Sequence, residues 1–212
     1  MADTVFDVNS PAATPSAGQA GFYPDSVSKK WTGINDAGRY DTLGDLENSS
    51  TANQTGFAAD TYLAGSSIAV PGHKVQVGTR YHLILDMVKN AAGTATPIFI
   101  VRIGTAGTVA DAARLTFTFA AGTAATDTGV IELWAHFRTV GATATMAGVA
   151  KLDHHLAATG LTTSGAAGTG IILATAASFD ASLAGLIIGT SFNGGTSFAG
   201  TNTVVQSRLF NC

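Results

Sequence analysis

The chain has 212 residues, of which 46% are apolar and only 12% are charged, and its formal net charge is −3. This balance excludes a disordered chain, which needs low hydrophobicity and high net charge, and eleven basic against fourteen acidic residues provide no basic face for nucleic acid. No apolar run approaches the roughly 18 residues that a membrane span needs. At the start of the chain, residues 1–20 contain Asp3 and Asp7 and no apolar core, so we expect no signal peptide.

Residues 1–60 differ from the rest of the chain in charge and in the spacing of apolar residues. They hold eight acidic and three basic residues, a net charge of −5, whereas residues 61–212 hold six acidic and eight basic residues, a net charge of +2. Apolar residues in the first segment occur singly, without a helical or strand period. We therefore predict an extended N-terminal arm over residues 1–60 and one compact domain over residues 61–212.

The compact domain is predicted to consist of β-strands. In residues 114–119, for example, Leu115, Phe117 and Phe119 alternate with polar residues, which gives a strand one apolar face. About eight such segments occur, at residues 81–87, 97–103, 114–119, 130–138, 144–152, 170–175, 185–192 and 203–210. One short helix is expected at 108–113. Many strands joined by turns predict an all-β fold, an antiparallel β-sandwich or a jelly roll.

A short repeat near the C-terminus predicts a hairpin. The tetrapeptide Gly-Thr-Ser-Phe occurs at 189–192 and again at 195–198, and Asn193-Gly194 lies between the two copies. Asn-Gly is a strong signal for a two-residue β-turn. A phosphate-binding glycine loop is the alternative, but the required lysine ending and strand–loop–helix context are missing.

The abundance of small residues points to assembly. Alanine (37), threonine (29) and glycine (25) together supply 91 of the 212 residues. Each small side chain buries little apolar area, so the core is stabilised less than a core of leucine or phenylalanine. Few charges protect the sheet edges from pairing with other chains. We expect an oligomer or a component of a larger assembly, and the alternative is a monomeric sandwich with a soft core.

One predicted strand places four notable residues on a single face: Glu132, Trp134, His136 and Arg138. Aromatic and charged side chains at a period of two are typical of a carbohydrate-binding surface. The same pattern also suits the packing and ion pairs of a subunit interface, which is the interpretation we favour.

Other polar residues give no catalytic or metal signature. Asp153, His154 and His155 are adjacent, so on a strand their side chains point to opposite faces and cannot all bind one ion. We expect solvent-exposed histidines in a turn. No nucleophile elbow of the form Gly-X-Ser-X-Gly occurs, and Cys212 has no activating neighbour, which predicts a free or intermolecular thiol. We therefore expect that the protein is not an enzyme and that it binds no metal and no cofactor.

Two stretches of the chain resemble a known group of proteins. Residues 78–99, GTRYHLILDMVKNAAGTATPIF, and their continuation at 102–113, RIGTAGTVADAA, resemble the opening strands of small jelly-roll proteins carried on tailed-bacteriophage particles. The resemblance extends over residues 61–212. It implies a protein that decorates a capsid or forms a head or tail fibre, usually as a homotrimer, and it supplies no catalytic residues.

The resemblance also implies a role for the arm. In such proteins an N-terminal arm often fastens the subunit to the particle, and Phe22, Tyr23 and Trp31 are candidate anchors that fill pockets of a partner. The sequence thus predicts a virion structural protein on the particle surface, bound to itself and to the major capsid protein, without direct contact with nucleic acid or membrane. The alternative function is a receptor- or glycan-binding module of a fibre, which would bind a host-surface glycan.

Overall fold

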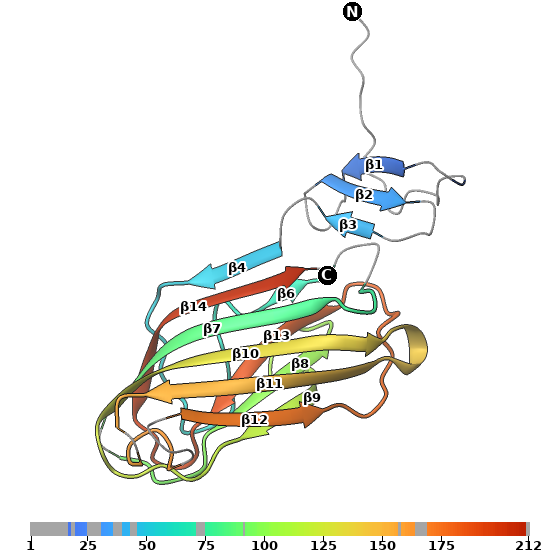
Figure 1. The fold of residues 1–212 in the computed structure, drawn as a ribbon. Coiled ribbons are helices and arrows are strands. Elements are labelled where there is room, and N and C mark those ends of the chain that lie inside the picture. Colours follow the sequence, from blue (N-terminus) through green and yellow to red (C-terminus); the bar gives the residue numbers. More distant parts are fainter. Residues whose placement is uncertain are drawn as a thin grey trace, which may run out of the picture.

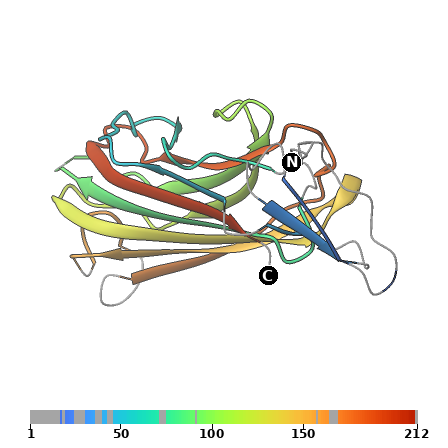
Figure 2. The same cartoon turned by 90° about the horizontal axis from the view of Figure 1, so that it is seen from above.

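The fold is known from a computed structural model of the chain. It describes residues 17, 20–24, 31–35, 40–42, 46–70, 75–90, 92–156, 158–163 and 169–210. Within this part of the chain the protein is all-β, and the paired strands run antiparallel to each other. Two sheets lie against each other as two layers, with the larger sheet in front in Figure 1 and both layers visible from above in Figure 2.

The larger sheet has six strands in the order β12-β11-β10-β7-β14-β4. Its strands are β4 (Leu46–Ser50), β7 (Arg80–Lys89), β10 (Asp127–Thr139), β11 (Thr145–His154), β12 (Thr169–Thr175) and β14 (Gly200–Phe210). The smaller sheet has the order β5-β13-β8-β9, and β6 also pairs with β13. Its strands are β5 (Thr61–Tyr62), β6 (Ile68–Ala69), β8 (Ile98–Gly104), β9 (Ala112–Thr118) and β13 (Ile187–Asn193). A 3-10 turn, η1 (Gly141–Thr143), joins β10 to β11.

The eight strands predicted from the sequence correspond to β7 through β14, which confirms the all-β prediction. The helix expected at 108–113 is wrong. The carboxylate of Asp111 accepts hydrogen bonds from the backbone N–H groups of Ala106 (3.0 Å) and Gly107 (2.7 Å). Such local side-chain bonds offer the backbone an alternative to a helix, so residues 105–111 form a loop and β9 begins at Ala112.

The segment expected to be an arm contains two kinds of structure. Strands β1 (Ala20–Pro24), β2 (Trp31–Asn35) and β3 (Tyr40–Thr42) pair into a three-stranded sheet of their own. Residues 46–60, by contrast, contribute to the sandwich, because β4 pairs with β14 and because Leu46 and Phe57 are buried in the core. Single apolar residues and a five-residue strand carry too short a pattern to be recognised in the sequence.

An aromatic cluster fills one part of the core. The rings of Phe99 and Phe192 are stacked with centroids 4.4 Å apart, Phe198 meets Phe192 edge-on at 5.4 Å, and Phe57 is tilted at 5.2 Å from Phe192. Aromatic pairs of this kind contribute roughly 0.5–1.5 kcal/mol each beyond the burial of their area. Among the described residues the core consists mainly of large apolar side chains, and alanine contributes only Ala135, Ala144, Ala150 and Ala181. The weakly stabilised core of small residues that the composition suggested is therefore not found.

The hairpin predicted at 189–198 is wrong, because β13 belongs to the smaller sheet and β14 to the larger one. The Asn193 side chain accepts a hydrogen bond from Gly195 N (2.9 Å), as expected for a turn. Gly194 N, however, donates to the carbonyl of Phe57 (2.8 Å), and the chain then passes to the other layer. The repeated phenylalanines still meet, as members of the core cluster rather than across a ladder.

Candidate interaction surface

The outer face of the six-stranded sheet is the side that points away from the smaller sheet. Along β10 the odd-numbered residues from 131 to 137 are buried in the core, whereas Glu132, Trp134 and His136 are half-buried on the outer face and Arg138 is exposed. The alternation follows from the two-residue period of a strand.

The neighbouring strand β7 completes this surface. His82 lies opposite Trp134 in the register, and the two rings are stacked with centroids 5.3 Å apart and planes 12° from parallel. His82 Nε2 also forms a 2.9 Å hydrogen bond with Glu132 Oε1. The imidazole therefore covers one face of the indole and ties it to a carboxylate. We call the following six residues the Trp134 surface: Arg80, His82, Glu132, Trp134, His136 and Arg138.

One end of the Trp134 surface is basic. Arg80 lies opposite His136 in the register, and Arg138 follows on the same strand. Burial, followed by the positive charges of Arg80 and Arg138, lowers the pKa of His136 below its ordinary value of 6.5. Among the described residues, no acidic side chain forms an ion pair with Arg80 or Arg138. A hollow of about 360 Å³ lies between Arg80, Trp134, His136 and Val149, and we call it the Trp134 hollow.

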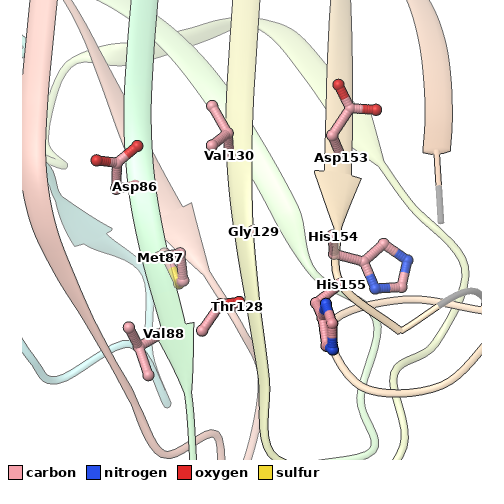
Figure 3. A pocket seen from close by; sticks show the side chains of 9 residues that line it. All are labelled: Asp86, Met87, Val88, Thr128, Gly129, Val130, Asp153, His154 and His155. Atoms are coloured by element: carbon pink, nitrogen blue, oxygen red, sulfur yellow. The ribbon is translucent and has the colours of Figure 1, made fainter.

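The other end of the outer face carries acidic and apolar groups. Asp86 of β7 and Asp153 of β11 are the register partners of Val130 on β10, and Figure 3 shows Val130 between the two carboxylates. Two rows of outward residues surround a shallow hollow of about 450 Å³. We call it the Val130 hollow, and its outward residues are Asp86, Val88, Thr128, Val130, Asp153 and His155.

The outer face is richer in apolar groups than the solvent side of a sandwich usually is. Outward positions of antiparallel sheets are normally polar, but here Ile84, Val88 and Val149 are half-buried and Val130 is 43% exposed. In the part of the chain that the structure describes, no element packs over these residues (Figure 1). Apolar side chains therefore remain on the outer face of the six-stranded sheet in the described part of the chain.

The amino-acid sequence indicates the β10 members of the Trp134 surface but not those on β7. The alternation within residues 81–87 does place His82 opposite the core face. Its position beside Trp134 depends on the register between strands about 50 residues apart in the chain, and a single sequence contains no signal for that register.

The structure corrects the expectation for the two histidines. His155 is exposed, as predicted, but the His154 side chain is fully buried, and its Nδ1 donates a 2.6 Å hydrogen bond to Asp127 Oδ2. An alternating strand that ends at His154 turns this residue inward. Within the described ranges, no group of three or more His, Cys, Asp or Glu side chains is arranged to hold a metal ion.

Other predicted positions lie partly or wholly outside the described residues. The backbones of Phe22, Tyr23 and Trp31 belong to β1 and β2, but their side chains are outside the description, and so is Cys212. Within the described residues, no helix is long and apolar enough to cross a membrane.

Comparison with models of known protein families gives no match, and comparison with curated proteins gives none either.

Proposed function

We propose that the chain is a structural protein of a tailed-bacteriophage particle, of the capsid-decoration or fibre type. Its sandwich would be a jelly roll that assembles as a homotrimer on the particle surface. The N-terminal residues would fasten it to the major capsid protein, with Phe22, Tyr23 and Trp31 as anchors. The resemblance of residues 78–113 supports this proposal, and so does the antiparallel two-sheet fold.

The observation that carries the proposal is the outer face of the six-stranded sheet, over which no element of the described residues packs. This face carries the apolar side chains of Val130, Val88 and Ile84. Each Å² of their apolar surface that a second subunit removes from water favours association by about 25 cal/mol. A stable contact needs roughly 800 Å² on each partner. We assign the Val130 hollow and its apolar neighbours to the contact between copies, which leaves the Arg80 end of the face accessible.

The proposed mechanism is cementing of the shell. A subunit that touches two adjacent capsomers adds contacts that must break before the shell opens under the pressure of packaged DNA. This role needs no catalytic group, no cofactor and no contact with nucleic acid or membrane. It needs a stable sandwich and adhesive surfaces.

Removal of the protein from the particle tests this function. Particles that lack the chain should release DNA at a lower temperature, or at a lower chelator concentration, than complete particles. Addition of the purified chain should restore the original value. Equal resistance of depleted and complete particles would contradict the cementing role.

A second candidate function is a glycan-binding module of a head or tail fibre. The Trp134 hollow favours it, because an aromatic side chain beside a hollow can pack against the apolar face of a sugar ring. Binding on a glycan array should be lost in Trp134→Ala and kept in Leu183→Ala, which alters an exposed apolar residue outside this surface. Equal binding by the two variants would exclude the Trp134 hollow as the glycan site.

A further inference from the structure

We propose that the Trp134 hollow binds a saccharide that carries a carboxylate group. The inference rests on the second candidate function above and specifies its ligand. It follows from three features of the hollow and its edge. They are the guanidinium groups of Arg80, which lines the hollow, and of Arg138, which lies two residues beyond His136 on the same strand, together with a neutral imidazole and an immobilised indole.

The guanidinium groups supply the attraction for the carboxylate. Arg80 and Arg138 are both exposed and both lie close enough to His136 to disfavour its protonation. No acidic side chain of the described residues neutralises either of them. Guanidinium groups bind carboxylates through paired, charge-assisted hydrogen bonds. The basic end of the surface therefore has unused capacity for an anion.

The imidazole of His136 supplies a hydrogen-bonding group of a different kind. Its lowered pKa keeps it neutral at neutral pH, so one ring nitrogen donates a hydrogen bond and the other accepts one. A sugar hydroxyl can both donate and accept, and so matches a neutral imidazole. His136 lines the same hollow as Arg80.

The indole of Trp134 supplies a fixed apolar wall. His82 stacks on one of its faces, and Glu132 holds the His82 ring through the 2.9 Å hydrogen bond. A side chain held in place before binding loses less conformational entropy when the ligand arrives. The part of the indole that borders the hollow is thus ready to pack against a pyranose ring.

The combination favours an acidic saccharide over an acidic peptide. An aspartate or glutamate side chain would use Arg80 and Arg138 but has no apolar ring to place beside Trp134. A hollow of about 360 Å³ lies within the range of small-molecule sites, at roughly 300–1,000 Å³. A sugar acid uses its carboxylate, its hydroxyls and its apolar ring face together.

Calorimetry with matched ligands tests the inference on the full chain. The two ligands are a disaccharide that contains glucuronic acid and the same disaccharide with glucose in its place. We expect the acidic ligand to bind at least about tenfold more tightly, since a hydrogen bond to a charged group contributes enough for one decade in Kd. Arg80→Gln and Arg138→Gln should each remove most of this preference.

Arg208→Gln is the matched control. Arg208 is an exposed arginine on the same face of the sheet, opposite His82 in the register, but it does not line the hollow and its charge is already paired with Glu47 (3.4 Å). Its replacement should therefore leave the preference unchanged. The thermal unfolding midpoints of the three arginine variants verify that each remains folded.

Each other outcome overturns the inference in a distinguishable way. Equal affinity for the two disaccharides would overturn the acidic ligand but keep the glycan-binding function. Binding of neither would overturn both, and the cementing role would still be judged by the particle experiment. Displacement of the acidic disaccharide by acetate or by a polyglutamate peptide at equal carboxylate concentration would show a general anion site or a peptide site instead.

Discussion

A single carboxylate organises the end of the sandwich where β10 begins and β11 ends. Asp127 Oδ2 accepts hydrogen bonds from His154 Nδ1 (2.6 Å) and Leu161 N (2.9 Å), while Oδ1 accepts from Thr128 N (2.9 Å) and Leu156 N (3.2 Å). The carboxylate is buried, so these donors replace the water that it loses. The carboxylate thus connects the start of β10 and the end of β11 to Leu156 and Leu161, which follow β11 in the chain.

Replacement of this carboxylate by an amide should destabilise the protein. In Asp127→Asn the amide NH₂ group faces donors, and at least one buried hydrogen bond is lost, so we expect a loss of about 2–4 kcal/mol in the free energy of unfolding. Glu47→Gln is the control, because Glu47 pairs with Arg208 on the exposed surface (3.4 Å) and such pairs contribute at most about 1 kcal/mol. Urea unfolding measures both, and equal losses would contradict the role of Asp127.

If the Trp134 hollow binds an acidic saccharide as proposed, His136 should make that binding dependent on pH. Burial and the charges of Arg80 and Arg138 lower the pKa of His136, whereas a bound carboxylate favours the imidazolium, so binding takes up a proton. Affinity for the glucuronic acid ligand should therefore rise several-fold as the pH falls below the ordinary histidine pKa of 6.5, because the free imidazole is largely neutral there and takes up a proton when the carboxylate binds. His82 and Glu132, in the adjacent positions, are the other titratable groups of this surface.

The variant His136→Asn separates the contributions to that pH dependence. It should bind at neutral pH but show a flatter dependence of Kd on pH, because Asn does not titrate. A pH profile identical to that of the unaltered protein would assign the proton uptake to another group and contradict the role of His136.

At the scale of elements, one tyrosine joins the two sheets through polar contacts. The Tyr81 hydroxyl of β7 donates a hydrogen bond to the carbonyl of Ser66 (2.7 Å). Its oxygen also lies 3.2 Å from Thr190 Oγ1 on β13, within hydrogen-bond distance. Tyr81 is fully buried, and burial raises its pKa. The contact therefore crosses the core from the larger sheet to the smaller one.

Two tyrosine-to-phenylalanine variants test the value of this contact. Tyr81→Phe should lose about 1–2 kcal/mol of stability, because it leaves buried partners unsatisfied. Tyr62 is the matched control. Its hydroxyl is buried without a hydrogen-bond partner among the described residues, and burial raises its pKa to about 12. Tyr62→Phe should be neutral or slightly stabilising in thermal unfolding, and the reverse order of the two variants would contradict these assignments.

The close approach of β9 to β11 depends on a missing side chain. A Cβ atom at Gly148 would lie 2.6 Å from the carbonyl oxygen of Trp134 and 2.9 Å from Leu115 Cδ1. Gly148→Ala should thus cost about 1–3 kcal/mol through overpacking. Ala147→Val adds more carbon on the outer face of the same strand and should change stability by less than about 0.5 kcal/mol. Equal effects in chemical denaturation would show that the two layers have room to adjust.

The sequence predicts strands of this protein better than it predicts their arrangement. β7 through β14 are recognisable because their apolar residues alternate over a sufficient length. The Asn193-Gly194 signal correctly indicates a turn, but nothing local shows that the chain then changes sheet. Inward positions with polar residues, such as Lys89 and His154, are equally hidden, since their partners Asp127, Thr123 and Ala125 come from other segments.

At the scale of the whole molecule, low charge and an apolar outer face have one common consequence. A chain with only 12% charged residues, whose Val130 is 43% exposed on the sandwich, has a surface suited to contact with other subunits. Closed rings of identical subunits cover such faces without leaving one exposed. The acidic N-terminal residues and the basic Arg80 end add charges of opposite sign, although salt weakens their attraction over distances beyond about 8 Å.

Coverage of the outer face by another copy is tested most directly by the mass of the full chain in solution, measured by light scattering during size-exclusion chromatography. We predict three times the chain mass of 21.4 kDa, and a fall toward one chain mass in Val130→Arg. Val109→Arg, which alters a valine of nearly equal exposure (44% against 43%) in the loop before β9, should keep the trimer mass. A single-chain mass for the unaltered protein, or an unchanged trimer in Val130→Arg, would contradict the assignment of this face to subunit contact.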